Sequence, residues 1–363
     1  MQKKLNQILT LGLLLTVLLG FCGWSIVKPD EPVSASERRK LAQFPPLSSA
    51  TVLSGAFMES FEAYSLDQFP LRDELRGLKA FTALELLHQS DNNGLYSDRG
   101  YLSRLDFPLD TASVDNAAER FRRVYDLCLT DAGAIYAVIV PDKNYYTDAS
   151  YPKMDYSALS ERLLAAMPYA KPIDLTGQLT LESYYRTDPH WWQEALAPAA
   201  QYLAQQMGTQ LSGSYETARL DTPFSGAYAG QYALPVAADD FCYLTNDTLA
   251  SCRVYDYEAE AWKTLYDLDA AAGDDPYAFF LSGSRALLTV ENPNASTDKE
   301  LILFRDSYGS AIASLLAEGY AKITLIDIRY LAPELLPRFV DFTGKDVLFL
   351  YSTTVLNSSN TLR

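Results

Sequence analysis

The 363-residue chain is poor in histidine, cysteine and basic side chains. It contains two histidines and four well-separated cysteines. This supply excludes a zinc finger, an iron–sulfur cluster and a histidine-rich metal centre, because each needs several such ligands close together. Thirty basic residues against 46 acidic ones give a net charge of −16. We therefore expect no nucleic-acid partner, since phosphate contacts need clustered Lys and Arg, and the sequence implies no metal or organic cofactor.

The composition is that of a folded protein. Hydrophobic residues make up 48% of the chain and aromatic residues 12%, which is too apolar for a disordered protein and enough for a sizeable core. Cys242 and Cys252 flank a nine-residue segment and can pair in an oxidising compartment or remain free thiols.

A long apolar segment lies near the N-terminus. The 23 residues Leu5–Val27 carry no charge and follow Lys3 and Lys4. As a helix they reach roughly 34 Å, enough to cross a hydrocarbon core of about 30 Å. The two lysines predict that residues 1–4 stay cytoplasmic and that the bulk of the chain is extracytoplasmic. The sequence therefore predicts a single-pass anchor over residues 5–27.

The alternative to an anchor is a removable signal peptide. Val33-Ser34-Ala35 is a weak version of a small-x-small cleavage site. Cleavage there would make the protein secreted. Residues 28–50, rich in Pro, Ser and charge, are interpreted as a stalk, and residues 51–363 as the extracytoplasmic domain.

Apolar and amphipathic segments alternate through much of this domain. Strands are expected at 134–140, 171–175, 300–304, 322–328 and 346–351, and helices at 157–167, 193–207, 311–318 and 333–339. This alternation predicts an α/β fold with a parallel sheet covered by helices on both faces. Residues 51–89 show helical spacing with a break at Pro70, and residues 94–105 indicate a hairpin. Residues 211–291 lack a clear period and are interpreted as an insertion with short antiparallel strands.

One motif with residues suited to catalysis is Phe304-Arg305-Asp306-Ser307-Tyr308-Gly309, directly after an expected strand. A serine at such a strand-to-helix turn lies at the carboxyl end of the sheet, where open α/β folds bind ligands. The free amides and positive dipole end of the following helix suit a developing oxyanion. The alternative is that Ser307 only caps the helix.

A second motif contains one of the two histidines, in Tyr184-Tyr185-Arg186-Thr187-Asp188-Pro189-His190-Trp191-Trp192. A serine attacks at neutral pH only when a base removes its proton, and a carboxylate usually orients that base. Asp188 lies two residues before His190, whereas His88 has no such neighbour. The two motifs together predict a triad of Ser307, His190 and Asp188.

Further residues around the two motifs are candidates for contacting a substrate: Tyr185, Arg186, Trp191, Trp192, Arg305 and Lys143. The aromatic side chains suit stacking on sugar rings, with packing around a turn as the alternative. The two arginines can bind an acidic sugar or pair with neighbouring carboxylates. Lys143 follows an expected strand end and can point into the same crevice.

The segment Asp188-Pro189-His190-Trp191 resembles the signature of the DHHW family, with Pro in place of the first His. Four further segments carry the resemblance: Arg38-Arg39-Lys40-Leu41, Phe69-Pro70-Leu71-Arg72-Asp73, Val140-Pro141-Asp142-Lys143 and Asp306-Ser307-Tyr308. The family is similar to the alginate O-acetylation proteins of the SGNH-hydrolase-like superfamily. The resemblance implies an SGNH-like fold in which Ser307 is the nucleophile, His190 the base and Asp188 its orienting carboxylate.

The resemblance also bears on the oxyanion hole. SGNH enzymes typically use a Gly amide and an Asn side chain, and the corresponding stretch here is Leu281-Ser282-Gly283-Ser284, with Ser284 where Asn is expected. Gly283, Ser284 and the backbone amide of Tyr308 are therefore the candidate donors, beside that of Ser307.

The resemblance implies acetyl transfer to a cell-surface or secreted polysaccharide. Two alternatives stay open: a carbohydrate esterase with the same triad, and a catalytically silent polysaccharide-binding scaffold that uses Trp191 and Trp192 for stacking. A membrane-bound protein that exports acetyl groups is an expected partner on the resemblance alone.

Overall fold

The computed structural model describes residues 2–34, 36–37, 39–148, 150–273 and 275–363. Ala35 of the candidate cleavage site and Arg38 of the DHHW-like segment lie outside these residues. The chain divides into two compact units, one made of Met1–Asn92 with Gly230–Pro235 and the other of Asn93–Ala229 with Val236–Arg363. The division therefore falls after Asn92, whereas the sequence suggested a boundary near Thr51.

The first unit is mainly helical. It contains α1 (Gln2–Val27), α2 (Ser49–Leu53), α3 (Ala56–Asp67), α4 (Arg72–Phe81) and a π-helical turn (Thr82–Leu86). In α1, the stretch Lys3–Val27 has the length and composition of a membrane span, which a signal sequence near the N-terminus also has. The predicted helical break is confirmed, because α3 ends before Pro70 and Leu71 turns into the left-handed region with φ 57°.

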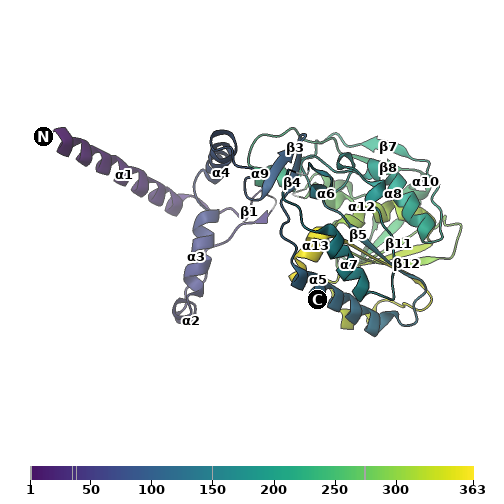
Figure 1. Ribbon diagram of the computed structural model, residues 1–363. Helices are drawn as coiled ribbons and strands as arrows, with labels where there is room; N and C mark the ends of the chain where they lie inside the picture. Colours follow the sequence, from purple (N-terminus) through teal and green to yellow (C-terminus); the bar gives the residue numbers. More distant parts are fainter. Residues whose placement is uncertain (1, 35, 38, 149, 274) are drawn as a thin grey trace. The chain divides into compact units, whose positions relative to one another are not determined.

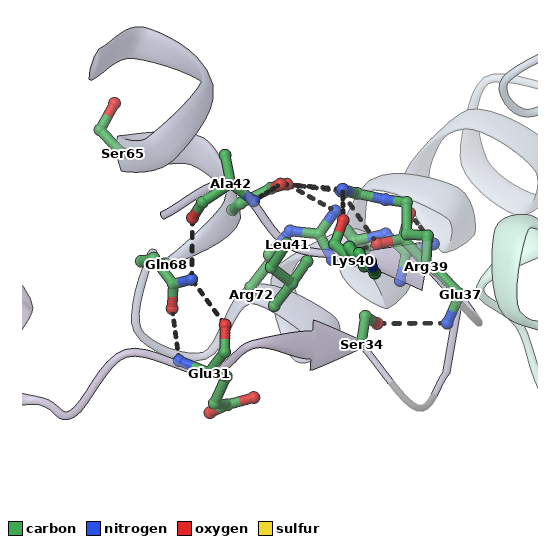
Figure 2. Close-up of polar contacts among 12 residues, drawn as sticks. Glu31, Ser34, Glu37, Arg39, Lys40, Leu41, Ala42, Ser65, Gln68 and Arg72 are labelled. Atoms are coloured by element: carbon green, nitrogen blue, oxygen red, sulfur yellow. Dashed lines mark hydrogen bonds and ion pairs between the residues drawn. The ribbon is translucent and has the colours of Figure 1, made fainter. Parts of the chain in front are cut away.

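A polar network joins two short strands of this unit, β1 (Val33–Ser34) and β2 (Arg39–Lys40), to α3 and α4 (Figure 2). Arg39 donates to Asp67 at 2.8 Å, and Arg72 lies 2.5 Å from Glu37. The hydrogen bond from Arg39 holds the pKa of Asp67 at about 2, against the opposing effect of burial. These contacts join two of the DHHW-like segments. Arg39 of one segment binds Asp67, which lies just before the other segment, and Arg72 of that other segment binds Glu37, which lies just before the first.

The second unit is built on an eight-stranded sheet of order β10-β9-β11-β13-β12-β14-β5-β6. Its strands are β5 (Ile135–Val140), β6 (Lys171–Pro172), β9 (Arg253–Asp256), β10 (Ala261–Thr264), β11 (Leu287–Glu291), β12 (Glu300–Arg305), β13 (Lys322–Ile326) and β14 (Asp346–Ser352). Strands β13, β12, β14, β5 and β6 pair in parallel, and β11, β9 and β10 pair antiparallel. The predicted α/β fold is confirmed as a mostly parallel sheet, and β9–β11 of the segment 211–291 extend that sheet.

Helices cover both faces of the sheet (Figure 1). They are α5 (Thr111–Val124), α7 (Tyr156–Ala166), α8 (Gln193–Gln206), α12 (Tyr308–Leu316) and α13 (Thr353–Asn357). Leu301 and Leu303 of β12 join the core under α8 and α12, and Ile302 and Phe304 join the core under α5 and α7. Alternate side chains point to opposite faces of a strand, so both faces of β12 are buried and its central residues 301–304 are all apolar.

Smaller elements complete this unit. The predicted hairpin is confirmed as β3 (Leu95–Asp98) and β4 (Tyr101–Arg104), and β7 (Glu216–Arg219) pairs with β8 (Cys242–Thr245). Short helices are α6 (Lys143–Tyr146), α10 (Asp247–Ser251) and α11 (Leu268–Ala271). A further short helix, α9 (Ala227–Tyr232), has residues in both units. The helix expected at 333–339 is a 3-10 helix over Pro333–Arg338. Cys242 and Cys252 are free thiols and do not pair.

Candidate active site

Ser307 occupies the turn between β12 and α12, as the sequence predicts. It is the N-cap residue of α12, yet its side chain makes no capping hydrogen bond. The carboxylate of Asp306 takes that place, accepting from the N–H of Tyr308 at 3.0 Å and from the N–H of Ser352 at 2.7 Å. The capping interpretation of Ser307 is therefore wrong, and its hydroxyl is free to bond elsewhere.

His190 and Asp188 lie at the tip of a tight hairpin formed by residues 183–192. The N–H of Tyr185 donates to the carbonyl of His190 at 3.0 Å, and the N–H of Trp192 donates to the carbonyl of Ser183 at 2.9 Å. Because the two arms are hydrogen-bonded to each other, the tip has little freedom to move.

Hydrogen bonds connect the three predicted triad side chains. His190 Nε2 lies 2.8 Å from Ser307 Oγ, and His190 Nδ1 lies 2.6 Å from Asp188 Oδ1. A carboxylate can only accept hydrogen bonds, so Nδ1 carries the proton and Nε2 accepts from the serine hydroxyl. The side chain of His190 is 15% exposed and that of Asp188 is 3% exposed. Solvent therefore reaches the histidine and serine end of this chain of bonds.

Asp188 is held in its ionised form. Its Oδ1 also accepts from the N–H of His190 at 3.1 Å, and its Oδ2 accepts from the N–H of Ala227 at 2.9 Å. Burial raises the pKa of Asp188, but the charge of His190 and these hydrogen bonds outweigh burial and hold the pKa at about 2. The carboxylate is thus charged at neutral pH and available to an imidazolium.

Lys143 forms hydrogen bonds to the backbone of this hairpin. Its ammonium is buried and donates to the carbonyl of Tyr185 at 2.9 Å and to that of Arg186 at 3.4 Å. Burial lowers the pKa of Lys143 to about 7, although Asp188, Asp239 and Asp142 oppose that effect. The prediction that Lys143 points into a substrate crevice is wrong, because its ammonium is buried and binds the backbone carbonyls of the hairpin.

Sequence reasoning missed two further supports, Asp239 and Gly226. Asp239 accepts from the backbone N–H groups of Arg186 at 3.0 Å and of Thr187 at 2.9 Å. A Cβ at Gly226 would overlap Asp188 Cβ and the carbonyl of Thr187, so only glycine fits there. Both lie in the stretch without a clear period, where no sequence signal marked them.

Tyr308 joins the two motifs. Its hydroxyl donates to the carbonyl of Pro189 at 2.8 Å, and its own carbonyl accepts from Trp191 Nε1 at 3.1 Å. Trp191 is completely buried. The prediction that Trp191 stacks on a sugar ring is therefore wrong, since it packs the hairpin against α12 instead.

Two of the predicted oxyanion donors are already engaged within the protein. The N–H of Tyr308 donates to Asp306, and the N–H of Gly283 donates to the carbonyl of Phe280 at 3.2 Å. These two assignments need correction, because both amides are spent on partners within the fold. Ser284 is exposed and stays a candidate. Within the described ranges, the N–H of Ser307 has no hydrogen-bond partner.

Of the other residues predicted to contact a substrate, two are buried and two are at least partly exposed. Tyr185 and Arg305 are completely buried, so predicting them as substrate contacts is wrong. Tyr185 packs on Phe224, with ring centroids 4.4 Å apart, and Arg305 donates to the carbonyl of Gly283 at 3.0 Å. In contrast, Trp192 is half-buried and Arg186 is exposed, and both stay candidates.

Metal-ligating side chains do not gather in the described part of the chain: no group of three or more His, Cys, Asp or Glu residues there is placed to hold an ion. The site described above consists of the triad and the residues that position it. Such an arrangement is suited to nucleophilic attack on an acyl group by an activated hydroxyl.

No sequence-family model matches the chain, and no curated protein matches its sequence. Among solved structures, a DHHW family protein from Eubacterium siraeum matches with a TM-score of 0.59 and 19% identity, covering 75% of this chain and 97% of that one. The two proteins share a fold. Bacillus cereus PatB1 with a sulfonyl adduct matches with a TM-score of 0.58 and 18% identity, covering 72% of this chain and 95% of that one. The O-acetyltransferase domain of Pseudomonas putida AlgJ matches more weakly, with a TM-score of 0.45 and 14% identity over 73% and 92% of the two chains.

The likeness to the first two structures confirms the fold expected from the resemblance, since one of them is a DHHW family protein. It covers 75% and 72% of this chain and nearly all of each matched protein.

Proposed function

We propose that this protein is an extracytoplasmic O-acyltransferase that carries an acetyl group on Ser307 and passes it to a hydroxyl of a polysaccharide. The observation that supports it most is the pair of hydrogen bonds, 2.8 and 2.6 Å long, that runs from Ser307 through His190 to Asp188. The DHHW-like fold adds support, because it is the fold that the sequence resemblance associates with acetyl transfer.

In the first half-reaction, Ser307 Oγ attacks the carbonyl carbon of the acetyl donor while His190 Nε2 takes the hydroxyl proton. The bond between the acetyl carbon and the donor then breaks, and His190 returns the proton to the leaving group. Asp188 stays ionised throughout and stabilises the imidazolium. The free N–H of Ser307, at the N-terminal end of α12, is the donor best placed for the oxyanion.

In the second half-reaction, a sugar hydroxyl gives its proton to His190 and attacks the acetyl carbon. The bond to Ser307 breaks, and Ser307 recovers its proton from His190. Within the hairpin, half-buried Trp192 and exposed Arg186 remain candidates for contacting the sugar.

A carbohydrate esterase is the second candidate, with water in place of the sugar hydroxyl. One observation favours it: His190 and Ser307 are both partly exposed, so water reaches the reacting atoms. Product analysis separates the two, since a transferase yields acetylated acceptor at acceptor concentrations where an esterase yields only acetate. The silent scaffold loses its main support, because Trp191 is buried.

We also propose that α1 is an uncleaved anchor, with residues 1–4 cytoplasmic, residues 28–50 a stalk and residues 51–363 extracytoplasmic. Acetyl groups would then need a membrane-bound export protein as partner, as the resemblance implies. Extraction of membranes at alkaline pH tests the anchor: the full chain should stay in the membrane pellet, whereas a cleaved form would appear in the soluble fraction.

The direct test of the proposed function is the Ser307→Ala variant. It should lose turnover of an acetyl-ester reporter and labelling by a serine-reactive fluorophosphonate, because no hydroxyl remains for His190 to activate. The PatB1 structure carries a sulfonyl adduct, so a sulfonyl fluoride offers a second probe. Ser310→Ala is a matched control, since Ser310 lies on the same helix and is buried outside the triad. Full turnover in Ser307→Ala would refute the proposal.

A further inference from the structure

Tyr277 lies flat against the imidazole of His190. The two ring centroids are 3.8 Å apart and the ring planes are inclined by 9°. Tyr277 belongs to a 3-10 helix (Pro276–Phe279) and is buried, with 4% of its surface exposed. No sequence motif marked this residue, because it precedes Ser307 by 30 positions and follows His190 by 87.

This geometry suits a charged imidazole better than a neutral one. Neutral aromatic pairs favour offset or edge-to-face arrangements with centroids about 4.5–7 Å apart, because their faces carry the same partial charge. A close, nearly parallel stack brings two such faces together. Once the imidazole is protonated, the same face of the tyrosine attracts it as a cation.

We propose that Tyr277 is a positioning residue that favours the imidazolium form of His190 and fixes the plane of its ring. The inference rests on the proposed function, in which His190 takes the proton of Ser307 during attack. The stack then stabilises the transition state more than the resting enzyme, which is the condition for accelerating a reaction. Asp188 binds the edge of the imidazole ring, and Tyr277 covers its face.

The surrounding chain holds Tyr277 rigidly. Its ring packs on Phe280 with centroids 5.2 Å apart, and the N–H of Asp267 donates to the carbonyl of Phe279 at 2.8 Å. The three residues after Phe280, which are Leu281, Ser282 and Gly283, all have positive φ, at 56°, 55° and 75°. This conformation is unfavourable for Leu and Ser and persists only where the surroundings enforce it. Such strain is typical of functional segments.

The hydroxyl of Tyr277 is not needed for this role. It is buried and has no hydrogen-bond partner among the residues that the structure describes. A buried unpaired hydroxyl costs stability, so removing it should leave the fold at least as stable. The inference therefore assigns the role to the ring and predicts that phenylalanine can replace tyrosine.

The test compares Tyr277→Phe with Tyr277→Leu on the full chain. With an acetyl-ester reporter, Phe should keep kcat within about twofold, and Leu should lower kcat about tenfold at unchanged KM. A tenfold loss corresponds to about 1.4 kcal/mol, within the range of a buried cation–π contact. The fluorophosphonate labelling rate of Ser307 should fall in parallel, and thermal unfolding shows whether each variant is folded.

A shape-matched variant separates electrostatics from packing. Pentafluorophenylalanine at position 277 keeps the ring but reverses the charge distribution on its face. It should therefore lower kcat below that of Tyr277→Phe, even where Tyr277→Leu fails to fold. Equal kcat for the fluorinated and unfluorinated rings would overturn the inference, as would a loss in Tyr277→Phe as large as in Tyr277→Leu. Failure of the proposed function is distinguishable, since turnover would then survive in Ser307→Ala.

Discussion

Replacing Asp188 by Asn tests the orientation of His190 most severely. The carboxylate accepts three hydrogen bonds, two on Oδ1 from His190 and one on Oδ2 from Ala227. An amide has only one oxygen, so its NH₂ group must face one of these donors. If it faces the N–H of Ala227, a buried donor loses its partner. If it faces His190, it donates to Nδ1 and forces the proton onto Nε2, where the ring cannot accept from Ser307.

The size of the effect follows from the charge of Asp188 and the tautomer of His190. The pKa of Asp188 is held at about 2, below the usual aspartate value of about 3.9, so a charged carboxylate faces the imidazole. Asn carries no charge to stabilise the imidazolium and favours the wrong tautomer, which lowers turnover by roughly 10⁴-fold.

The same substitution changes stability in a pH-dependent way. Because the folded pKa lies below the unfolded one, the carboxylate stabilises the wild type fully above about pH 4 and loses this contribution as the pH falls towards 2. The Asn variant should lack this dependence. Near pH 7 it should also be less stable by about 1–3 kcal/mol, the cost of one unpaired buried donor.

The measurements are turnover of an acetyl-ester reporter and urea unfolding of the wild type and the variant at pH 7. Asp240→Asn is a matched control, because Asp240 is exposed and pairs with Arg219 at the surface. A folded Asp188→Asn protein that retains more than a tenth of wild-type turnover would refute the role given to Asp188.

Two further substitutions test the supports of the hairpin. The pKa of buried Lys143 is about 7, so above pH 7 the unfolded chain binds a proton that the folded chain has released. The wild type should therefore gain about 1 kcal/mol of stability between pH 7 and pH 8. Lys143→Met should abolish this gain, and urea unfolding at both pH values measures it. An unchanged gain in the variant would contradict this account. Gly226→Ala should cost about 1–3 kcal/mol and lower turnover, because its Cβ overlaps Asp188, whereas Gly177→Ala, where nothing lies within 4 Å, should change neither. Equal stability and turnover in the two glycine variants would contradict the close contact between Gly226 and the hairpin.

Strands buried on both faces were predictable because burial leaves a direct trace in the sequence. The runs at β5, β12 and β14 are continuously apolar, and the structure places all three inside the sheet. By contrast, β9 and β10 alternate between exposed or half-buried and more buried positions. Their short, mixed sequences gave no reason to place them in the same sheet, since antiparallel pairing at an edge depends on distant partners.

The contact between Ser307, His190 and Asp188 was predictable because the proposed chemistry needs few residue types. With two histidines in the chain, only His190 has an aspartate two residues away, and Ser307 follows a strand at the carboxyl edge of the sheet. The positioning residues carry no such restriction. Asp239, Gly226 and Tyr277 act through contacts with residues 38 to 87 positions away, and no local spacing encodes such contacts.

The aromatic residues show the limit of interpreting a motif without burial. Tyr185 and Trp191 beside a candidate histidine favoured sugar stacking, yet both are completely buried. Their size serves the hairpin: Trp191 fills the space against α12 and donates to Tyr308, which in turn holds the carbonyl of Pro189. The same residues that suggest a ligand thus stabilise the position of His190.

Trapping the acyl-enzyme tests the central claim most directly. The purified protein is mixed with an activated acetyl ester, quenched in acid within the first turnovers, digested and analysed by mass spectrometry. The account predicts one acetyl group on the peptide that contains Ser307, and none on that peptide in the His190→Ala variant. Turnover without acetyl on Ser307, or with acetyl on another residue, would contradict it.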